Sequence, residues 1–268
     1  MIVIKIGGSS EINYNYIAED LVNFKKEKII IVLGANYLRN KLAEKLNIEV
    51  KTIESESGIK SVYTTQEIID LIIMTYSGLA QKRFICLLNK LGINAIGLTG
   101  IDGNLVLANK KIITSKINGK IKLITDNYTG KIISLNKDLI NLILDHGYVL
   151  VLTQPVTSVD REILNTDNDQ LVYVIAKEIK PSKIIYLINK DGILEDVSND
   201  QALIKNLTIN KIAEILNNKN IDYGIQKKLL YIKNIIEETG IEIFISNGTI
   251  KNPITNALNF RGTYVKKE

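Results

Sequence analysis

The first ten residues, MIVIKIGGSS (residues 1–10), decide how the fold begins. Residues 2–6 form an apolar run of strand length that only Lys5 interrupts, and two glycines follow directly. A lysine among apolar neighbours is costly to bury unless its ammonium group meets a fixed anion. An isolated glycine pair after a strand is more often a simple tight turn, but it also lets main-chain N–H groups approach phosphate oxygens at the start of a helix. The stretch therefore raises the hypothesis of a phosphate site at the carboxyl end of a strand.

Outward from this stretch, apolar runs of strand length alternate with longer segments of helical period, which is typical of α/β layering. The pattern predicts a three-layer αβα sandwich with a mostly parallel central sheet. Two of the predicted helices end at a glycine, as helices often do. Further strands are expected over residues 29–34, 94–100, 148–154, 183–188, 241–246 and 262–265, the last as an edge strand. Helices are expected over 16–26, 37–46, 64–92, 136–147 and 167–179, with two more between 189 and 240.

Two segments interrupt this alternation. In residues 106–124, lysine-alternating runs flank Asn118-Gly119, a turn dipeptide that predicts an antiparallel hairpin added to the sheet. The turn-rich segment 153–165 favours a boundary near residue 160. We expect an N-terminal lobe over residues 1–160 and a C-terminal lobe over residues 161–268, with one sheet continuous across both.

Composition excludes several classes of function. The 268-residue chain has one cysteine, Cys86, and one histidine, His146, so an intrachain disulfide, a zinc cluster and Ser-His-Asp catalysis are disfavoured. It shows no signal-peptide pattern and no uninterrupted apolar run of about 18–20 residues, which indicates a cytoplasmic protein without a membrane span. The net charge of +5 is scattered rather than clustered, which argues against nucleic acid and leaves an acidic or phosphorylated partner open.

Seven motifs follow one another along nearly the whole chain: KIGGS (5–9), GIKSVYTTQE (58–67), LGINAIGLTGIDGNLVLA (91–108), NYTGKI (127–132), LNTDND (164–169), GIQKK (224–228) and SNGTIKNPITNAL (246–258). Together and in this order, they resemble the amino acid kinase family. Within the family, the chain is most similar to the branch that phosphorylates the distal carboxylate of aminoadipate or glutamate held on a carrier protein, with N-acetylglutamate kinase as close kin.

The resemblance implies the amino acid kinase fold, with acceptor binding and dimerisation in residues 1–160 and nucleotide binding in residues 161–268. It also implies ATP-dependent formation of an acyl phosphate in lysine or arginine/ornithine biosynthesis. ATP would bring Mg²⁺, held mainly by phosphates and water, so no protein metal ligand is expected. The partner would be a small acidic amino-group carrier protein or a small N-acylated amino acid, and the enzyme would be a homodimer.

The family's catalytic residues match three positions: Lys5 and Lys228 would flank the transferring phosphoryl group, Lys5 on its oxygens and Lys228 on the leaving side. Asp169 would accept hydrogen bonds from both lysines. Such placed charges suit a reaction between two anions. The implied ATP and phosphate contacts are Gly7, Gly8, Asn189 and Gly224, and the implied acceptor contacts are Gly34, Ala35, Lys60, Val62 and Asn165.

Three departures from the family pattern concern the substrates. Ala35 and Asn36 follow Gly34 where the family has further glycines, and a Cβ atom there would resist a left-handed backbone if one were required. Val62 stands where the carrier-dependent branch has an arginine, although Lys60 could serve instead. Ile188-Asn189 replaces the family's Thr-Asp pair. Beside the carrier-dependent kinase, the sequence therefore leaves open an N-acetylglutamate kinase, a kinase with a changed acceptor and a non-catalytic nucleotide-binding regulator.

Overall fold

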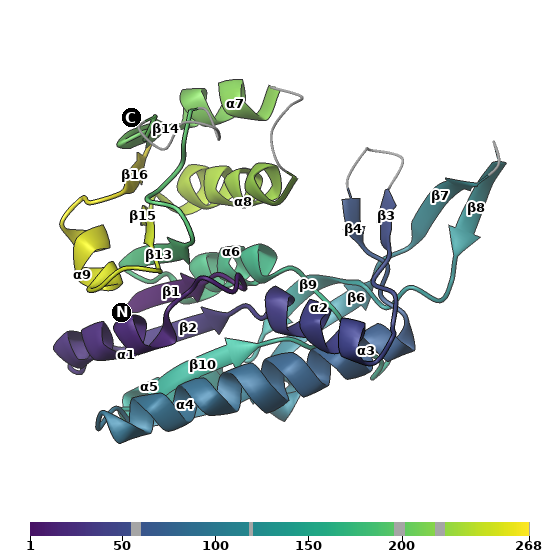
Figure 1. Ribbon diagram of the computed structural model, residues 1–268, viewed down its shortest axis with the longest axis horizontal. Coiled ribbons are helices and arrows are strands. Elements are labelled where there is room, and N and C mark those ends of the chain that lie inside the picture. The colour runs from purple at the N-terminus through teal and green to yellow at the C-terminus, as the bar shows by residue number, and fades with distance from the viewer. Residues whose placement is uncertain (55–59, 118–119, 196–201, 218–222, 268) are drawn as a thin grey trace.

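The computed structural model describes residues 1–54, 60–117, 120–195, 202–217 and 223–267 (Figure 1). Its centre is an eight-stranded sheet in the order β14-β16-β15-β13-β1-β2-β10-β5. Every neighbouring pair is parallel except β15 and β16. The strands are β1 (Ile2–Ile6), β2 (Ile29–Leu33), β5 (Ala95–Thr99), β10 (Val149–Thr153), β13 (Lys183–Ile188), β14 (Asn206–Thr208), β15 (Glu242–Asn247) and β16 (Thr263–Lys266).

The sheet is continuous through the middle of the molecule because β1 pairs with β2 on one side and with β13 on the other. Register partners of Lys5 are Val32 on β2 and Tyr186 on β13. All five residues of β1 are buried, as expected for a central strand covered on both faces. The predicted mostly parallel sheet, shared by the two halves of the chain, is confirmed.

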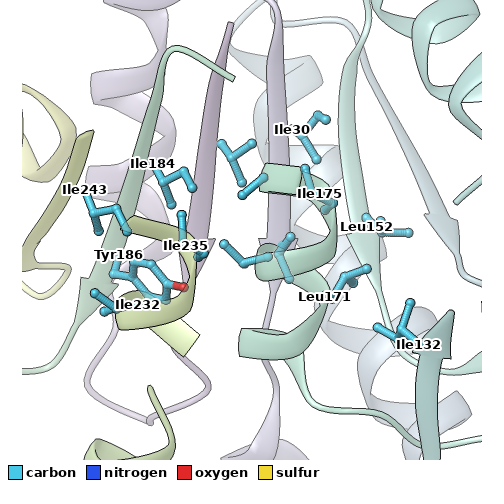
Figure 2. Packing of buried hydrophobic residues seen from close by; sticks show 14 of the residues in the cluster. Ile30, Ile132, Leu152, Leu171, Ile175, Ile184, Tyr186, Ile232, Ile235 and Ile243 are labelled. Atoms are coloured by element: carbon cyan, nitrogen blue, oxygen red, sulfur yellow. The ribbon is translucent and has the colours of Figure 1, made fainter. Parts of the chain in front are cut away.

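Helices cover both faces of the sheet and complete the predicted three layers (Figure 1). Two groups of helices pack on the sheet, one on each face. Buried apolar residues form one core between the sheet and the first group and a second core between the sheet and the opposite group. Figure 2 shows the second core, in which Ile175, Ile184 and Ile235 pack together. The first group is α1 (Tyr14–Leu21), α3 (Gln66–Ile72), α4 (Gln81–Lys90) and α9 (Pro253–Leu258); the opposite group is α5 (Lys137–Asp145), α6 (Asn168–Ile179), α7 (Ile209–Asn217) and α8 (Tyr223–Thr239).

Strand alternation decides which way Lys5 points. Ile4 and Ile6 belong to the core under α1, whereas Val3 belongs to the core under α6 and α8. Successive side chains of a strand point to opposite faces, so Lys5 shares the face of Val3. The lysine therefore lies beneath α6 and α8.

The predicted hairpin forms, but the prediction that it joins the main sheet is wrong. Residues 106–110 instead form β6 (Val106–Lys110) of a separate four-stranded sheet, and the hairpin strands pair only with each other among the described residues. Ile112, which links β6 to the hairpin, is 86% exposed, so the chain leaves the body there. The turn at Asn118-Gly119 lies outside the described residues. The other strands are β7 (Ile113–Ile117) and β8 (Lys120–Ile124) of the hairpin, β9 (Gly130–Leu135), β11 (Val156–Ser158) and β12 (Ile163–Leu164) of the four-stranded sheet, and the paired β3 (Thr52–Glu54) and β4 (Lys60–Val62).

The helix expected over residues 64–92 is present, but its middle is a π-helix, η2 (Ile73–Ala80), between α3 and α4. Thr75 Oγ1 donates to Leu71 O at 2.6 Å and Ser77 Oγ donates to Ile73 O at 2.8 Å. These hydroxyls compete with main-chain donors for the carbonyls, which favours a wider turn.

The same helical run, Gln66–Lys90, is long and apolar enough to cross a bilayer by length and composition, yet 44% of its most apolar window is buried inside the molecule. A core helix of this kind passes the same test, so the run is weak evidence for a membrane span.

Three smaller expectations also need correction. The first helix ends at Leu21 and continues as the 3-10 turn η1 (Val22–Phe24), short of the predicted residue 26. The strand β16 is not an edge strand, because β14 pairs on its outer side. Helix α9 and the 3-10 turn η3 (Asp102–Asn104) were not expected. The predicted glycine ends hold: Gly92 and Gly147 follow α4 and α5 with φ of 70° and 77°, a backbone conformation that favours glycine.

Candidate active site

The structure brings Lys5, Asp169 and Lys228 into direct contact. Lys5 Nζ lies 3.5 Å from Asp169 Oδ1, and Lys228 Nζ donates to Asp169 Oδ2 at 3.3 Å. The three residues are only 8–9% exposed. Two ammonium groups thus share one carboxylate, which leaves an excess positive charge at a nearly buried point.

The three residues come from β1, α6 and α8, and the apolar pattern of each helix explains its orientation. Lys228 precedes Ile232 by four residues, so both lie on the buried face of α8. Asp169 precedes Val172 by three residues on α6 and shares its inward face. The core packing therefore holds the charged groups together at the carboxyl end of β1.

The lysines change the protonation of this cluster. Burial opposes ionisation of Asp169, but the ammonium groups of Lys228 and Lys5 outweigh it and lower the pKa of the carboxyl below its usual range. Burial, together with the neighbouring Lys5, lowers the pKa of Lys228 to about 8, although Asp169 opposes the shift. The site therefore keeps its carboxylate ionised and holds a lysine whose charge depends on its surroundings.

Tyr186 forms the floor beneath Lys228. The ammonium nitrogen of Lys228 lies 5.3 Å from the centroid of the Tyr186 ring, within the range of a cation–π contact. The tyrosine is fully buried between Ile184 and Ile232 (Figure 2). Burial and the negative charge of Asp169 raise the pKa of its hydroxyl well above the usual value, so the ring stays neutral.

The glycine pair lets two loops meet above this cluster. A Cβ atom on Gly8 would lie 2.6 Å from the main-chain nitrogen of Asn36 and 3.0 Å from that of Ala35. Tyr37 N donates to Gly8 O at 2.9 Å, which ties the loop to the first turn of α2 (Asn36–Lys45). Only glycine at position 8 permits this approach, and it brings the positive end of the α2 dipole to the site.

A cleft of about 450 Å³ collects the predicted residues. It is lined by every predicted site residue whose side chain the structure describes, except Ala35. Arg39, Lys111 and Lys227 line it too, so among the described residues five basic side chains, with Lys5 and Lys228, face two acids, Asp167 and Asp169. This excess of positive charge suits an anionic ligand such as a polyphosphate. The predicted residues in the lining are Lys5, Gly7, Gly8, Gly34, Val62, Asn165, Asp169, Asn189, Gly224 and Lys228.

Three of the predicted acceptor contacts line the cleft, and Ala35 does not. Gly34, Val62 and Asn165 line the cleft, and Asn165 Nδ2 donates to Thr64 Oγ1 at 3.1 Å. Ala35 is buried behind the cleft, with φ of −144°, so the expected conflict between its Cβ atom and a left-handed backbone does not arise. Lys60 begins β4, but its side chain lies outside the described part of the chain.

Several cleft residues escaped the sequence analysis. Arg39 and Tyr76 enter from α2 and η2, and the signal for Arg39 was its place three residues after Asn36 on one helix face. The buried Gln154 holds the loop before α6, since its Oε1 accepts from Thr166 N at 2.9 Å. Lys227 forms an ion pair with Asp167, the N-cap residue of α6. Lys227 could have been predicted as a site residue, because it belongs to the motif GIQKK.

Lys111 is a further cleft residue that the sequence did not reveal. Partial burial, with the neighbouring Lys227, lowers its pKa. Its main-chain nitrogen donates to Thr129 O at 2.8 Å, where the chain leaves β6. The lysine thus adds positive charge to the wall that carries Asn165 and Thr129.

Asn189 lies at the opposite end of the cleft, after β13. Its Nδ2 donates to Glu11 Oε2 at 2.5 Å, which links β13 to the loop that follows Gly8. Ile188 and Asn189 themselves carry no charge, and both line the cleft. Among the described residues there is no cluster of three or more His, Cys, Asp or Glu side chains that could hold a metal ion.

Comparisons with known proteins cover the whole chain. A model described as the amino acid kinase family matches residues 1–247. The [LysW]-aminoadipate kinase of Thermus thermophilus is 32% identical over 269 residues, which cover 99% of this chain and 100% of the relative. The [LysW]-aminoadipate/[LysW]-glutamate kinase of Sulfolobus acidocaldarius is also 32% identical, with the same coverage of 99% and 100%.

Solved structures share the fold at lower identity. N-acetylglutamate synthase of Neisseria gonorrhoeae superposes with a TM-score of 0.80 at 18% identity, over 100% of this chain and 59% of that chain. The Streptococcus mutans protein smu.665 superposes with a TM-score of 0.76 at 21% identity, over 100% and 98% of the two chains. These likenesses bear on the fold alone.

Proposed function

Because the chain belongs to the amino acid kinase family, we propose that it transfers the γ-phosphoryl group of ATP to the distal carboxylate of a carrier-linked aminoadipate or glutamate. The predicted family and kinase class are confirmed by the family match and the full-length relatives. The observation that carries the proposal is the convergence of Lys5, Asp169 and Lys228 in one cleft. The product is an acyl phosphate for lysine or arginine/ornithine biosynthesis.

The reaction joins two anions, so the protein must offset their repulsion. A carboxylate oxygen of the acceptor forms a bond to the γ-phosphorus, and the bond from that phosphorus to the β–γ bridging oxygen breaks. Lys5 stabilises the equatorial oxygens of the moving phosphoryl group, and Lys228 stabilises the charge that develops on the leaving oxygen. Asp169 positions both ammonium groups, because it lies within 3.5 Å of each.

The residues present fit ATP. Because Gly8 has no Cβ atom, the main-chain nitrogens of Ala35 and Asn36 can lie close to the end of β1, where Gly7 and Gly8 line the cleft. Asn189 and Gly224 lie at the nucleotide end of the same cleft. Mg²⁺ supplies charge neutralisation of the phosphates when bound. Asp167 and Asp169 already pair with lysines, so phosphate oxygens and water would provide most of its ligands.

The acceptor, the assembly and the location belong to the same proposal. Residues 1–160 would bind the acceptor through Gly34, Ala35, Lys60, Val62 and Asn165 and would form a homodimer, and residues 161–268 would bind nucleotide. The acceptor would be presented by a small acidic carrier protein in the cytoplasm, supported by the names of the relatives and by the positive net charge of the chain. Neither nucleic acid nor a membrane is required.

The test is acyl phosphate formation from ATP and Mg²⁺, trapped with hydroxylamine. Carrier-linked aminoadipate, carrier-linked glutamate and N-acetylglutamate serve as acceptors. The proposal expects hydroxamate from a carrier-linked acceptor, and a Lys5→Met variant should lose at least about 100-fold in kcat. Hydroxamate only from N-acetylglutamate would reassign the acceptor, and none from any acceptor, with nucleotide still bound, would favour a non-catalytic regulator.

A further inference from the structure

Arg39 is a nearly buried cation for which the described part of the chain supplies no counter-ion. The residue is 7% exposed and lines the cleft from the first turn of α2. Its Nε and Nη2 atoms donate to Asn40 Oδ1 at 3.1 and 2.8 Å, and no carboxylate among the described residues pairs with it. Burying a guanidinium without an anion costs several kcal/mol, so its retention at the cleft indicates an anion that arrives with a ligand.

Asn36 and Tyr76 line the same cleft as Arg39 and add hydrogen-bonding groups to it. Asn36 and Arg39 lie three residues apart on α2 and therefore on one face of the helix. Tyr76, presented by η2, donates its hydroxyl to Asn36 Oδ1, which leaves the Asn36 amide nitrogen as a further donor. The positive charge of Arg39 acts on Tyr76 strongly enough to oppose the rise that burial causes in the pKa of the tyrosine. The cluster offers donors and positive charge, the complement of a carboxylate.

The side chains of the facing strand β4 that the structure describes carry no positive charge. Ser61 and Val62 of β4 line the cleft with neutral side chains. Lys227 is already paired with Asp167, and Lys5 and Lys228 share Asp169. Arg39 is the cleft cation that lies three residues from Asn36 on the same helix.

We infer that Arg39 determines acceptor specificity by binding a second carboxylate of the acceptor, the α-carboxylate, while the distal carboxylate meets the phosphoryl group near Lys5. The inference rests on the proposed carboxylate kinase function. The acceptor would then carry two carboxylates: the distal carboxylate, which is phosphorylated, and the α-carboxylate, which Arg39 binds. A guanidinium can hold the second by two parallel hydrogen bonds, which fixes the length of acceptor that reaches the phosphoryl group.

The test compares carrier-linked aminoadipate with the same conjugate whose α-carboxylate is a carboxamide. The wild type should prefer the carboxylate by about 100-fold in kcat/KM, and Arg39→Met should reduce this preference to about 1 with KM for ATP unchanged. Arg39→Lys should retain part of the preference, because lysine keeps the charge but not the paired geometry. Lys45→Met, which removes an exposed cation from the last turn of the same helix α2, is the matched control and should keep the preference.

The urea midpoint of unfolding distinguishes a ligand-binding role of Arg39 from a structural role. Arg39→Met removes a buried charge that no carboxylate of the described residues neutralises, so the urea midpoint of the free protein should rise or stay unchanged. A lower midpoint together with an intact preference for the carboxylate would overturn the inference while leaving the kinase proposal standing.

If the wild type phosphorylates neither conjugate, the hydroxamate assay with the other acceptors decides the kinase proposal, and calorimetric binding of the two conjugates still tests Arg39. Tighter binding of the carboxylate form by the wild type, lost in Arg39→Met, would uphold the inference. Equal binding of both forms by the wild type would overturn it.

Discussion

At the scale of single residues, two amines and one carboxylate form the centre of the candidate site. Asp169 is the one carboxylate that pairs with Lys5 and Lys228 in a nearly closed environment, so the cluster depends on its single acid. The position of Lys5 in an otherwise apolar strand was sufficient to predict an anion beside it. Arg39 was not predictable in the same way, since an arginine in a helix usually lies on its solvated face.

Asp169→Asn should destabilise the protein strongly, because it leaves two ammonium groups without a carboxylate. We expect a loss of about 3 kcal/mol in the free energy of unfolding at pH 7, measured by urea denaturation. Asp145→Asn is the control: its partner Lys28 lies on the surface with half of its side chain exposed, so the loss should stay below about 1 kcal/mol. Equal effects of the two substitutions would contradict the importance of burial here.

Lys228 should take up a proton when nucleotide binds. Its pKa of about 8 in the free cleft lies below the usual 10.5 because burial disfavours the charged form, and an anionic phosphate beside it favours that form. Binding of ATP near pH 8 should therefore absorb up to about half a proton, and uptake should vanish near pH 6, where the lysine is already charged. Calorimetric titrations in buffers of different ionisation enthalpy measure this, and Lys228→Arg should abolish it.

At the scale of elements, the approach of the loop after β1 to the N-terminus of α2 is the most restrictive contact. Gly8→Ala places a methyl group 2.6 Å from Asn36 N, so the two segments must separate. We expect KM for ATP to rise at least about 10-fold and the urea midpoint to fall. Ser10→Ala, an exposed position in the same loop, should change neither quantity. An unchanged KM in Gly8→Ala would show that the loop does not cradle phosphate.

The long helix is fastened to the sheet by Gln81, the first residue of α4. Its buried Nε2 donates to Leu98 O of β5 at 2.8 Å and to Val151 O of β10 at 2.9 Å. Gln81→Ala should lower the free energy of unfolding by about 2 kcal/mol, since two hydrogen bonds are lost inside the core. Lys82→Ala, at the exposed neighbouring position, should leave stability within about 0.5 kcal/mol of the wild type in the same urea titration.

The elements also show where sequence reasoning succeeds and where it stops. Long apolar strands and glycine-terminated helices were predictable because their signals are local. The π segment was not, because helical periodicity does not distinguish it from an α-helix, and Thr75 and Ser77 read as ordinary helix residues. The four-stranded sheet was missed for another reason: β11 and β12 have three and two residues, too few for a pattern.

At the scale of the whole molecule, one sheet joins the two halves of the chain through the pairing of β1 with β13. Neither half can keep its sheet intact without the other, so urea unfolding should occur in a single transition. Fluorescence of the tyrosines and far-ultraviolet circular dichroism should report the same midpoint. Two separate transitions would show that the halves unfold independently despite the shared sheet.

The central place of β1 has a consequence for biosynthesis. Translation delivers β1 before its partner β13, which emerges only after about 180 further residues. The nascent chain therefore carries an apolar strand with an open edge, and Lys5 without Asp169, until those residues have left the ribosome. Met1 O accepts from Ser182 N at 3.0 Å in the finished molecule, so a fusion partner belongs at the other terminus.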